Sequence, residues 1–350
     1  LKMPNAHFLY GRNVPNYSGK ITEWLFPSLG HIPVLNAAVD RKSMENIRDA
    51  ITSGSFPIAL APEGQVTYHM HKVENIERGT AVMAQWAHKE LSQKGEAKDI
   101  RILPIAIGYQ FLRGYEELFN DVLSRLREET GLDLIKEDDW YATWYSAGKQ
   151  VLQHIEQMLQ KYHEKAFTDY APDEKEQIEQ LCKKILTISE EMSGLSANND
   201  SIINRVFKVR YSAMRKQYRE DVDPEKLPPL EKIVADYHAA EAHMYLRYNE
   251  IVDILEYIDF DYIYPGCKEN RLAEFALNIL DIVNRAEGGS ISTRYYPKGR
   301  SPIMYIGEPI STIDILNDED IGRREKANQI NDMLFRGMSE TSEKLEKLLT

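Results

Sequence analysis

The order of apolar and polar positions in the first 110 residues predicts strands that alternate with amphipathic helices. Short apolar runs typical of strands occupy residues 6–10, 32–35, 56–61 and 101–109. Between them, apolar residues recur at the three- and four-residue intervals of a half-buried helix in residues 18–29, 43–53 and 77–93. Such alternation predicts a largely parallel sheet with helices packed on its faces.

The apolar run Ile58-Ala59-Leu60-Ala61 leads directly into the turn sequence Pro62-Glu63-Gly64, and this is the most informative stretch of the chain. Ligands of open α/β sheets bind at the carboxyl ends of the strands, where this run would place a carboxylate. Glu63 is therefore the first candidate site residue. The competing interpretation is structural, because a carboxylate here can cap the following helix or pair with a surface cation.

Beyond Phe111 the strand patterns give way to helical ones. Apolar residues repeat at helical spacing from about Tyr115 to Glu287, interrupted by proline- and glycine-containing breaks. A strand pattern returns at 302–310, and a charged helical pattern from 318 to 349 closes the chain. We therefore predict an α/β fold, with a mostly parallel sheet flanked by helices and a large all-helical insertion.

Several of these segments together resemble the glycerophospholipid acyltransferase family of the lysophosphatidate acyltransferase type. That family has an apolar strand ending in Asp-Arg, a Phe-Pro-Glu-Gly-Thr-Arg block, a basic residue followed by Gly, and a Val-Pro-Val strand. Matching positions occur here in the same order, at Asp40-Arg41, Pro62-Glu63-Gly64, Arg78-Gly79 and Pro104. The strand pattern that ends in Gly307-Glu308-Pro309 is similar to the last strand of the family.

The chain departs from the family pattern at two places. Gln65-Val66 stands where the family has Thr-Arg. The first block of the family, an Asn-His with an Asp five positions after the His, is not found before Arg41, because the residue five positions after His7 is Arg12. We therefore name no catalytic residue. The chain opens with Leu1 rather than Met, from which we expect a missing N-terminal segment.

The resemblance implies a domain organisation. Residues 1–112 would form the first part of an acyltransferase α/β core, and residues 113–294 a helical insertion. Residues 295–350 would supply the last strand and the C-terminal helices of the same core. The strands on both sides of the insertion are then expected to belong to one sheet, because the last strand cannot bury its apolar side alone.

The resemblance also implies a reaction, the transfer of a fatty acyl group from an acyl thioester to a hydroxyl of a glycerophosphate or lysophospholipid acceptor. The donor would be acyl-coenzyme A or acyl carrier protein, and no cofactor or metal is implied. The substrate-binding residues carried over from the family are Arg41, Pro62, Glu63, Gly64, Gln65, Arg78 and Gly79. The alternative is an acyltransferase-like module that lacks the catalytic His and binds a lipid or an acyl carrier without turnover.

Structural interpretations compete with these assignments. Arg41 can be a solvated residue at a strand end. Arg78 lies at a predicted helix start, where a cation is mildly unfavourable, and this favours a ligand role. His69 and His71 have no third ligand close in sequence, so we predict a polar loop or a lining of the acceptor pocket rather than a metal site.

The composition of the chain limits the kinds of partner and the cellular location that we expect. The chain has 350 residues and a net charge of -12, which argues against nucleic acid, because duplex binding depends on clustered Lys and Arg. Cys182 and Cys267 lack metal-type spacing and are typical of reduced thiols in a cytoplasmic protein. No apolar run reaches the ~18–20 residues that a bilayer span requires. We expect a cytoplasmic protein with a peripheral contact to the inner face of the membrane.

One basic segment of the helical region is a candidate for that contact. Its cations lie within 15 residues and are interleaved with apolar side chains; they are Arg205, Lys208, Arg210, Arg215, Lys216 and Arg219. Interfacial helices present such a mixture to anionic headgroups. The competing interpretation, which we favour, is a bundle helix whose apolar residues are core and whose cations pair with neighbouring acids.

Overall fold

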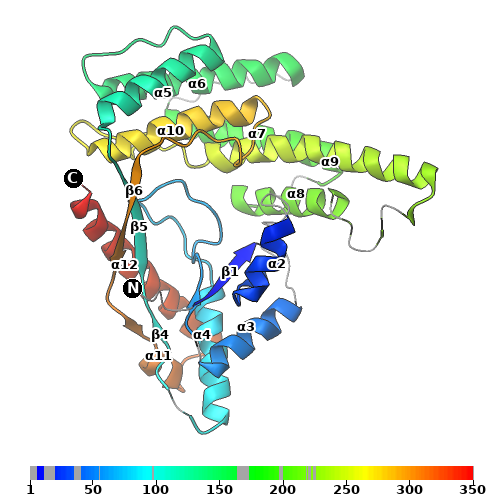
Figure 1. The fold of residues 1–350 in the computed structure, drawn as a ribbon, viewed down its shortest axis with the longest axis vertical. Helices are drawn as coiled ribbons and strands as arrows, with labels where there is room; N and C mark the ends of the chain where they lie inside the picture. The colour runs from blue at the N-terminus through cyan, green and yellow to red at the C-terminus, as the bar shows by residue number, and fades with distance from the viewer. Residues whose placement is uncertain are drawn as a thin grey trace. The chain divides into compact units, whose positions relative to one another are not determined.

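The computed structural model (Figure 1) describes residues 6–11, 20–34, 41–54, 56–96, 98–163, 173–196, 200–217, 219, 222–223 and 226–349. The chain divides into two compact units. Unit 1 combines residues 1–110 with residues 301–350, and unit 2 consists of residues 111–300. The chain therefore leaves unit 1 once and returns to it once.

Unit 1 begins with a small parallel sheet. β1 (His7–Gly11) is its middle strand, and β2 (Ile32–Val34) and β3 (Ile58–Ala59) pair with β1 on either side, both parallel to it. α2 (Lys20–Ser28) connects β1 to β2, and α3 (Arg41–Ser53) connects β2 to β3. Parallel neighbours require such crossovers because each strand must start from the same end of the sheet.

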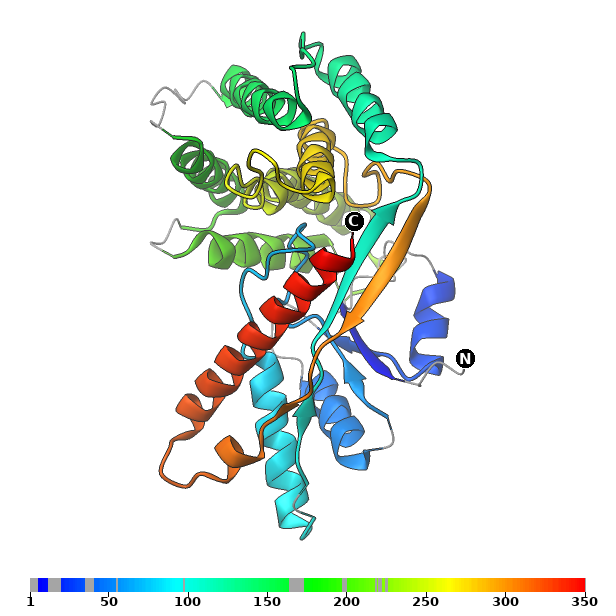
Figure 2. The same cartoon turned by 90° about the vertical axis from the view of Figure 1, so that its left-hand side faces the viewer.

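The other strands of unit 1 come from the two sides of unit 2 in the sequence. β4 (Arg101–Ile102) pairs antiparallel with β7 (Ile310–Ser311). β5 (Ile105–Phe111) pairs with β6 (Arg300–Ile306), and the two strands run in opposite directions (Figure 2). The remaining helices of unit 1 are α4 (Gly79–Gln93), α11 (Ile313–Asn317) and α12 (Arg323–Leu348). They share one apolar cluster, made of Ala81, Leu316, Ala327 and Ile330.

The predicted mostly parallel sheet is wrong. The described strands form three separate sheets of two or three strands, and most of the described chain is helical. One physical reason lies at Pro104, which has no N–H to donate to a ladder. It divides the strand expected over residues 101–109 into β4 and β5, which take different partners.

A second reason lies in the two faces of β5. Ala106 and Gly108 face α12 and Leu349, the residue that follows it. Leu349 packs so closely that a Cβ built on Gly108 would lie 2.5 Å from its Cδ1. Ile105 and Ile107 point away and are 40% and 48% exposed. The apolar run therefore combines a small inward face with an exposed outward face, whereas a central parallel strand is buried on both faces.

Unit 2 contains six helices among its described residues. They are α5 (Tyr115–Thr130), α6 (Trp140–His163), α7 (Glu174–Ser193), α8 (Ile202–Gln217), α9 (Pro229–Leu255) and α10 (Glu269–Ala286). α10 packs on α5, α6 and α9, and α9 packs in turn on α7 and α8 (Figure 1). None of the described helices of the chain combines the length and the apolar character that crossing a membrane requires.

Local sequence sets the ends of α7. The side chain of Asp173 accepts a hydrogen bond of 2.8 Å from the backbone N–H of Glu176, which satisfies one of the free donors at the helix start. Gly194 follows the last turn with φ of 73°, a left-handed conformation that a glycine adopts without strain.

α8 contains most of the basic segment considered as a membrane contact. Arg205 is buried, and its guanidinium donates to both carboxylate oxygens of Glu190 at 2.8 Å. Three further cations pair with nearby acids: Lys208 with Asp200, Arg210 with Asp253 and Lys216 with Glu241. These contacts confirm the bundle-helix interpretation for the four cations concerned.

Candidate functional site

Residues 60–78, here called the site loop, connect β3 to α4 and carry most of the predicted site residues. The backbone N–H of Glu77 donates to the carbonyl oxygen of Pro62 at 2.8 Å and draws the two ends of the loop together. Pro62, Glu63 and Gly64 are thereby brought close to Arg78 and Gly79, the last pair of the predicted set. The loop thus gathers these five residues at the start of α4.

Gly64 is required by the shape of the turn. Its φ is 74°, which side-chain-bearing residues rarely adopt. A Cβ at this position would also lie 2.8 Å from Cγ of Glu77, on the returning side of the loop. Conformation and space therefore both favour glycine here.

The carboxylate of Glu63 is partly buried and is held inside the site loop. One oxygen accepts the backbone N–H of Glu74 at 3.1 Å, and the other accepts the hydroxyl of Thr67 at 3.3 Å. Burial raises the pKa of Glu63, and these two hydrogen bonds partly offset that rise. These two partners of the Glu63 carboxylate, Thr67 and Glu74, belong to the loop and not to the first turn of α4.

Glu74 is held by two side chains of the same loop, His69 and Lys72. Nδ1 of His69 lies 3.4 Å from a carboxylate oxygen of Glu74, and Nζ of Lys72 lies 2.8 Å from it. The contact with His69, followed by that with Lys72, lowers the pKa of Glu74 to about 2 against the opposing effect of burial. Glu74 in turn supplies the N–H that holds Glu63.

The sequence analysis missed the pairing of His69 with Glu74. The two residues have the spacing of the first family block, a His and a carboxylate five positions later, but with Glu for Asp and after the Glu-Gly turn instead of before it. This spacing of five positions between His69 and Glu74 is the feature of the sequence from which the pair could have been found. The side chain of His69 is only 1% exposed, so its imidazole is covered by the surrounding residues. His69 thus contacts Glu74, whose backbone N–H in turn donates to the carboxylate of Glu63.

The other predicted residues differ in placement. Arg41 is the first residue of α3 and not the end of a strand; Asp40 and the side chain of Arg41 lie outside the described residues. Gln65 is partly buried directly after the turn. Arg78 is exposed and forms no ion pair within the described part of the chain, and Gly79 is the exposed first residue of α4.

Contacts with β5 and α12 fix the middle of the site loop. The carbonyl oxygen of Met70 accepts the hydroxyl of Ser342 at 2.7 Å, and its sulfur accepts the backbone N–H of Tyr109 at 3.1 Å. The side-chain amide of Asn331 donates to the carbonyl oxygen of Ile76 at 3.4 Å. The C-terminal helix of unit 1 therefore helps to position the loop that carries Glu63.

Neither a cluster of metal-binding side chains nor a similarity to known proteins indicates what the site binds. Among the described residues, no group of three or more His, Cys, Asp or Glu side chains is arranged to hold a metal ion. Comparison with protein-family models, curated proteins and solved structures finds no match to this chain. The functional argument therefore rests on the residues of the site loop and their geometry.

Glu74 makes the stability of the protein depend on pH in an identifiable window. Its pKa is lowered from 4.5 to about 2 on folding, so its contribution is present above about pH 4.5 and is lost as the pH falls towards 2. We expect Glu74→Gln to reduce the free energy of unfolding at neutral pH by about 1–2 kcal/mol, allowing for solvent screening. The difference from the unmutated protein should disappear near pH 2.

Urea unfolding of both proteins between pH 7 and the acid limit of folding measures this difference. Glu77→Gln is the matched control, because the exposed carboxylate of Glu77 makes no hydrogen bond or ion pair to any described residue. A difference between Glu74→Gln and the unmutated protein that is independent of pH would contradict the assigned ion pairs.

Proposed function

We propose that this protein transfers a fatty acyl group from an acyl thioester to a hydroxyl of a glycerophosphate or lysophospholipid acceptor. The observation that carries the proposal is the Pro62-Glu63-Gly64 turn after β3, with a partly buried carboxylate oriented by two hydrogen bonds. Such a carboxylate can accept a hydrogen bond from an acceptor hydroxyl in a fixed direction. Arg78, at the other end of the loop, is available to an anionic group such as the acceptor phosphate.

The surroundings of the site loop also suit a lipid substrate. Met70 of the loop contacts Tyr109 of β5, and β5 and β6 expose apolar side chains on one face: Ile105, Ile107, Met304 and Ile306. An acyl chain or the surface of a bilayer is the kind of partner that such side chains bind. A peripheral membrane contact through this face therefore belongs to the proposal.

A second candidate function is favoured by the burial of His69. The imidazole of His69, which contacts Glu74, is buried. The described residues around Glu63 therefore present no exposed imidazole that could act as the general base. A module that binds a lysophospholipid or an acyl carrier without turnover needs no such base. The two functions share the acceptor site and differ in whether product forms.

A transfer assay separates the two functions. The purified full-length protein is incubated with palmitoyl-coenzyme A and either glycerol 3-phosphate or a lysophosphatidate, and acylated product is measured by liquid chromatography and mass spectrometry. We expect product with the unmutated protein and a loss of kcat/KM of about tenfold to one hundredfold in Glu63→Gln, which removes a charged hydrogen-bond acceptor. Glu96→Gln, an exposed glutamate outside the site loop, is the control for the charge change.

Measurements on the same samples also show which outcomes would contradict acyl transfer and which would contradict an acceptor site in the site loop. Acceptor binding that requires Glu63 in calorimetry, without any product, would establish the binding module. The absence of both product and Glu63-dependent binding would remove the site loop from consideration as an acceptor site.

A further inference from the structure

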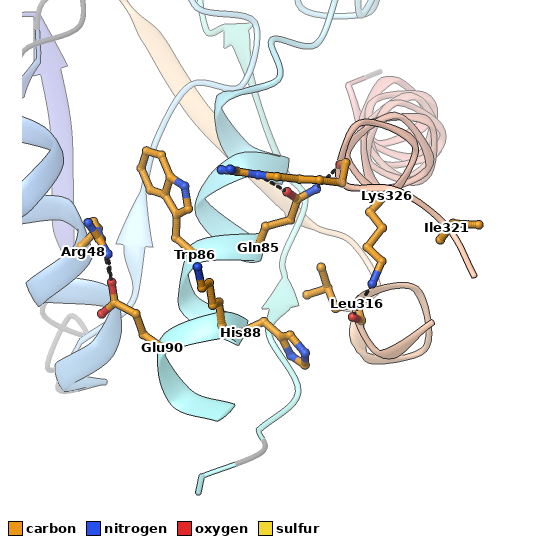
Figure 3. Close-up of a pocket in the computed structure, with 10 residues that line it drawn as sticks. Arg48, Gln85, Trp86, His88, Glu90, Leu316, Ile321 and Lys326 are labelled. Atoms are coloured by element: carbon orange, nitrogen blue, oxygen red, sulfur yellow. Dashed lines mark hydrogen bonds and ion pairs between the residues drawn. The ribbon is translucent and has the colours of Figure 1, made fainter. Parts of the chain in front are cut away.

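Unit 1 contains a recess, none of whose lining residues belongs to the site loop. It lies among α3, α4, α11 and the start of α12, and has a volume of about 470 Å3 (Figure 3). Small-molecule sites in proteins commonly have volumes of about 300–1,000 Å3. The recess is therefore large enough for a ligand of the size of a nucleotide.

The lining of the recess is cationic in a protein whose net charge is -12. Arg48, Lys89, Arg323 and Lys326 line it, against the single carboxylate of Glu90. That carboxylate is already occupied, because Nε of Arg48 donates to it at 2.6 Å (Figure 3). No carboxylate of the lining is left to balance the other three cations, so the recess favours an anionic ligand.

Arg323 is oriented for such a ligand by Gln85. Its Nε donates to the side-chain oxygen of Gln85 at 3.2 Å, and the side-chain nitrogen of Gln85 donates to the carbonyl oxygen of Arg323 at 2.8 Å. Gln85 is only 8% exposed, which fixes this reciprocal pair. The two terminal nitrogens of Arg323 make no hydrogen bond or ion pair to any described residue. Guanidinium groups bind phosphate through such nitrogens.

Lys326 and His88 add further donors. Nζ of Lys326 donates to the carbonyl oxygen of Leu316 at 2.8 Å, which places the ammonium group at the wall of the recess (Figure 3). Burial, and then the nearby charge of Lys326, lower the pKa of His88, so its imidazole is neutral at pH 7. Lys89 is exposed at the rim and has no partner among the described residues.

Trp86 gives the recess an aromatic wall. It comes from α4 beside Gln85 and is partly exposed, and Figure 3 shows its indole extending from the helix. Indole faces stack on nucleobases, and cationic side chains bind the attached phosphates. Trp86 and the cations therefore offer complementary partners to a ligand that carries both groups.

We propose that this recess binds a nucleotide, with its base against Trp86 and its phosphates on Arg323, Lys326 and Lys89. The ligand chemistry has two sources, a free nucleotide such as ADP and the nucleotide part of coenzyme A. The second source would connect the recess to the donor substrate, but the proposal does not depend on acyl transfer.

Isothermal titration calorimetry of the full chain at low ionic strength tests the proposal with four probes: ADP, coenzyme A, adenosine and pyrophosphate. ADP should bind more tightly than adenosine, which lacks phosphates, and more tightly than pyrophosphate, which lacks the base. Trp86→Ala should weaken ADP binding by about tenfold or more, the usual effect of losing a stacked base. Arg323→Ala with Lys326→Ala should weaken it by at least about one hundredfold, because two charge-assisted hydrogen-bond donors are lost.

A matched pair of variants controls for general electrostatics. Arg324→Ala with Lys344→Ala removes the same charge from exposed positions of α12 outside the recess and should change ADP affinity by less than about twofold. Because loss of the Arg323–Gln85 pair can disturb folding, a second pair of variants leaves that contact intact: Lys89→Glu on α4 and Lys94→Glu at its C-cap. Lys89→Glu should weaken ADP binding by about tenfold, and Lys94→Glu should not.

The outcomes are distinct. Binding of ADP but not of coenzyme A identifies a free nucleotide as the ligand, and tighter binding of coenzyme A identifies the donor; both support the proposal. No binding of either ligand, pyrophosphate binding as tight as that of ADP, or equal losses in the recess and control variants would overturn it. The transfer assay on Glu63 uses neither these variants nor this readout, so the two proposals fail independently.

Discussion

Replacing Glu190 with alanine is expected to reduce the free energy of unfolding by about 3–5 kcal/mol. The carboxylate is 4% exposed and receives two hydrogen bonds from Arg205, whose own side chain is 9% exposed. Removal of the carboxylate leaves the guanidinium buried without its counter-charge. The remaining acceptors of Arg205, the hydroxyl of Thr187 and the carbonyl oxygen of Lys183, are neutral and do not replace it.

Two further variants isolate the cause. Glu179→Ala removes a carboxylate from the same helix, but its partner Lys183 is exposed, so the expected loss is at most about 0.5 kcal/mol. Replacing Glu190 with leucine and Arg205 with methionine together removes both charges and should restore most of the stability. Urea unfolding monitored by circular dichroism measures all three. A loss below about 1 kcal/mol for Glu190→Ala would show that Arg205 reaches water in solution.

The sequence placed the short elements of unit 1 more reliably than their pairing. The patterns at residues 6–10, 32–35 and 56–61 correspond to the positions of β1, β2 and β3. The resemblance led us to expect that a strand after the helical insertion pairs with one before it, and β6 does pair with β5. The pattern of apolar residues alone does not predict this pairing, because it joins segments separated by the whole of unit 2. An apolar run gives the same pattern when its outward face is left exposed as when both faces are covered. The predicted single sheet failed for that reason.

The candidate site shows the same division between local and distant determinants. The Pro62-Glu63-Gly64 turn after a strand, with glycine at a positive φ, follows from neighbouring residues and could be predicted from them. The hydrogen bond from Glu74 to Glu63 and the burial of His69 depend on how the loop folds back on itself. Their residue types are visible in the sequence, but their contacts are not.

The cationic recess could not be predicted from any short stretch of the sequence. Lys89 and Trp86 belong to α4, whereas Arg323 and Lys326 come from the start of α12, on the far side of unit 2 in the sequence. Each group of cations is ordinary on the surface of a helix when it is considered alone. Only the packing of α4 against α11 and α12 places them around one volume.

The helical unit has its own test in Trp144, whose side chain is fully buried in α6 and lies 5.7 Å from the ring of Phe119, centroid to centroid. Trp144→Ala should reduce the stability of unit 2 by about 3–5 kcal/mol, because a cavity of indole size cannot refill from neighbouring side chains. Trp144→Phe should cost much less, since the buried Nε1 has no hydrogen-bond partner among the described residues and its loss removes an unsatisfied donor.

The reactivity of Cys182 measures this loss of stability. Its thiol is buried in α7 and burial raises its pKa, so it reacts only when unit 2 opens. In a Cys267→Ser background, Trp144→Ala should accelerate its modification by Ellman's reagent about one hundred- to several-thousandfold, the kinetic equivalent of the stability loss. Tyr162→Ala, on the same helix but with a largely exposed ring, should leave the rate nearly unchanged. Equal rates in both variants would mean that Cys182 becomes accessible through a local opening of α7, independent of the packing around Trp144.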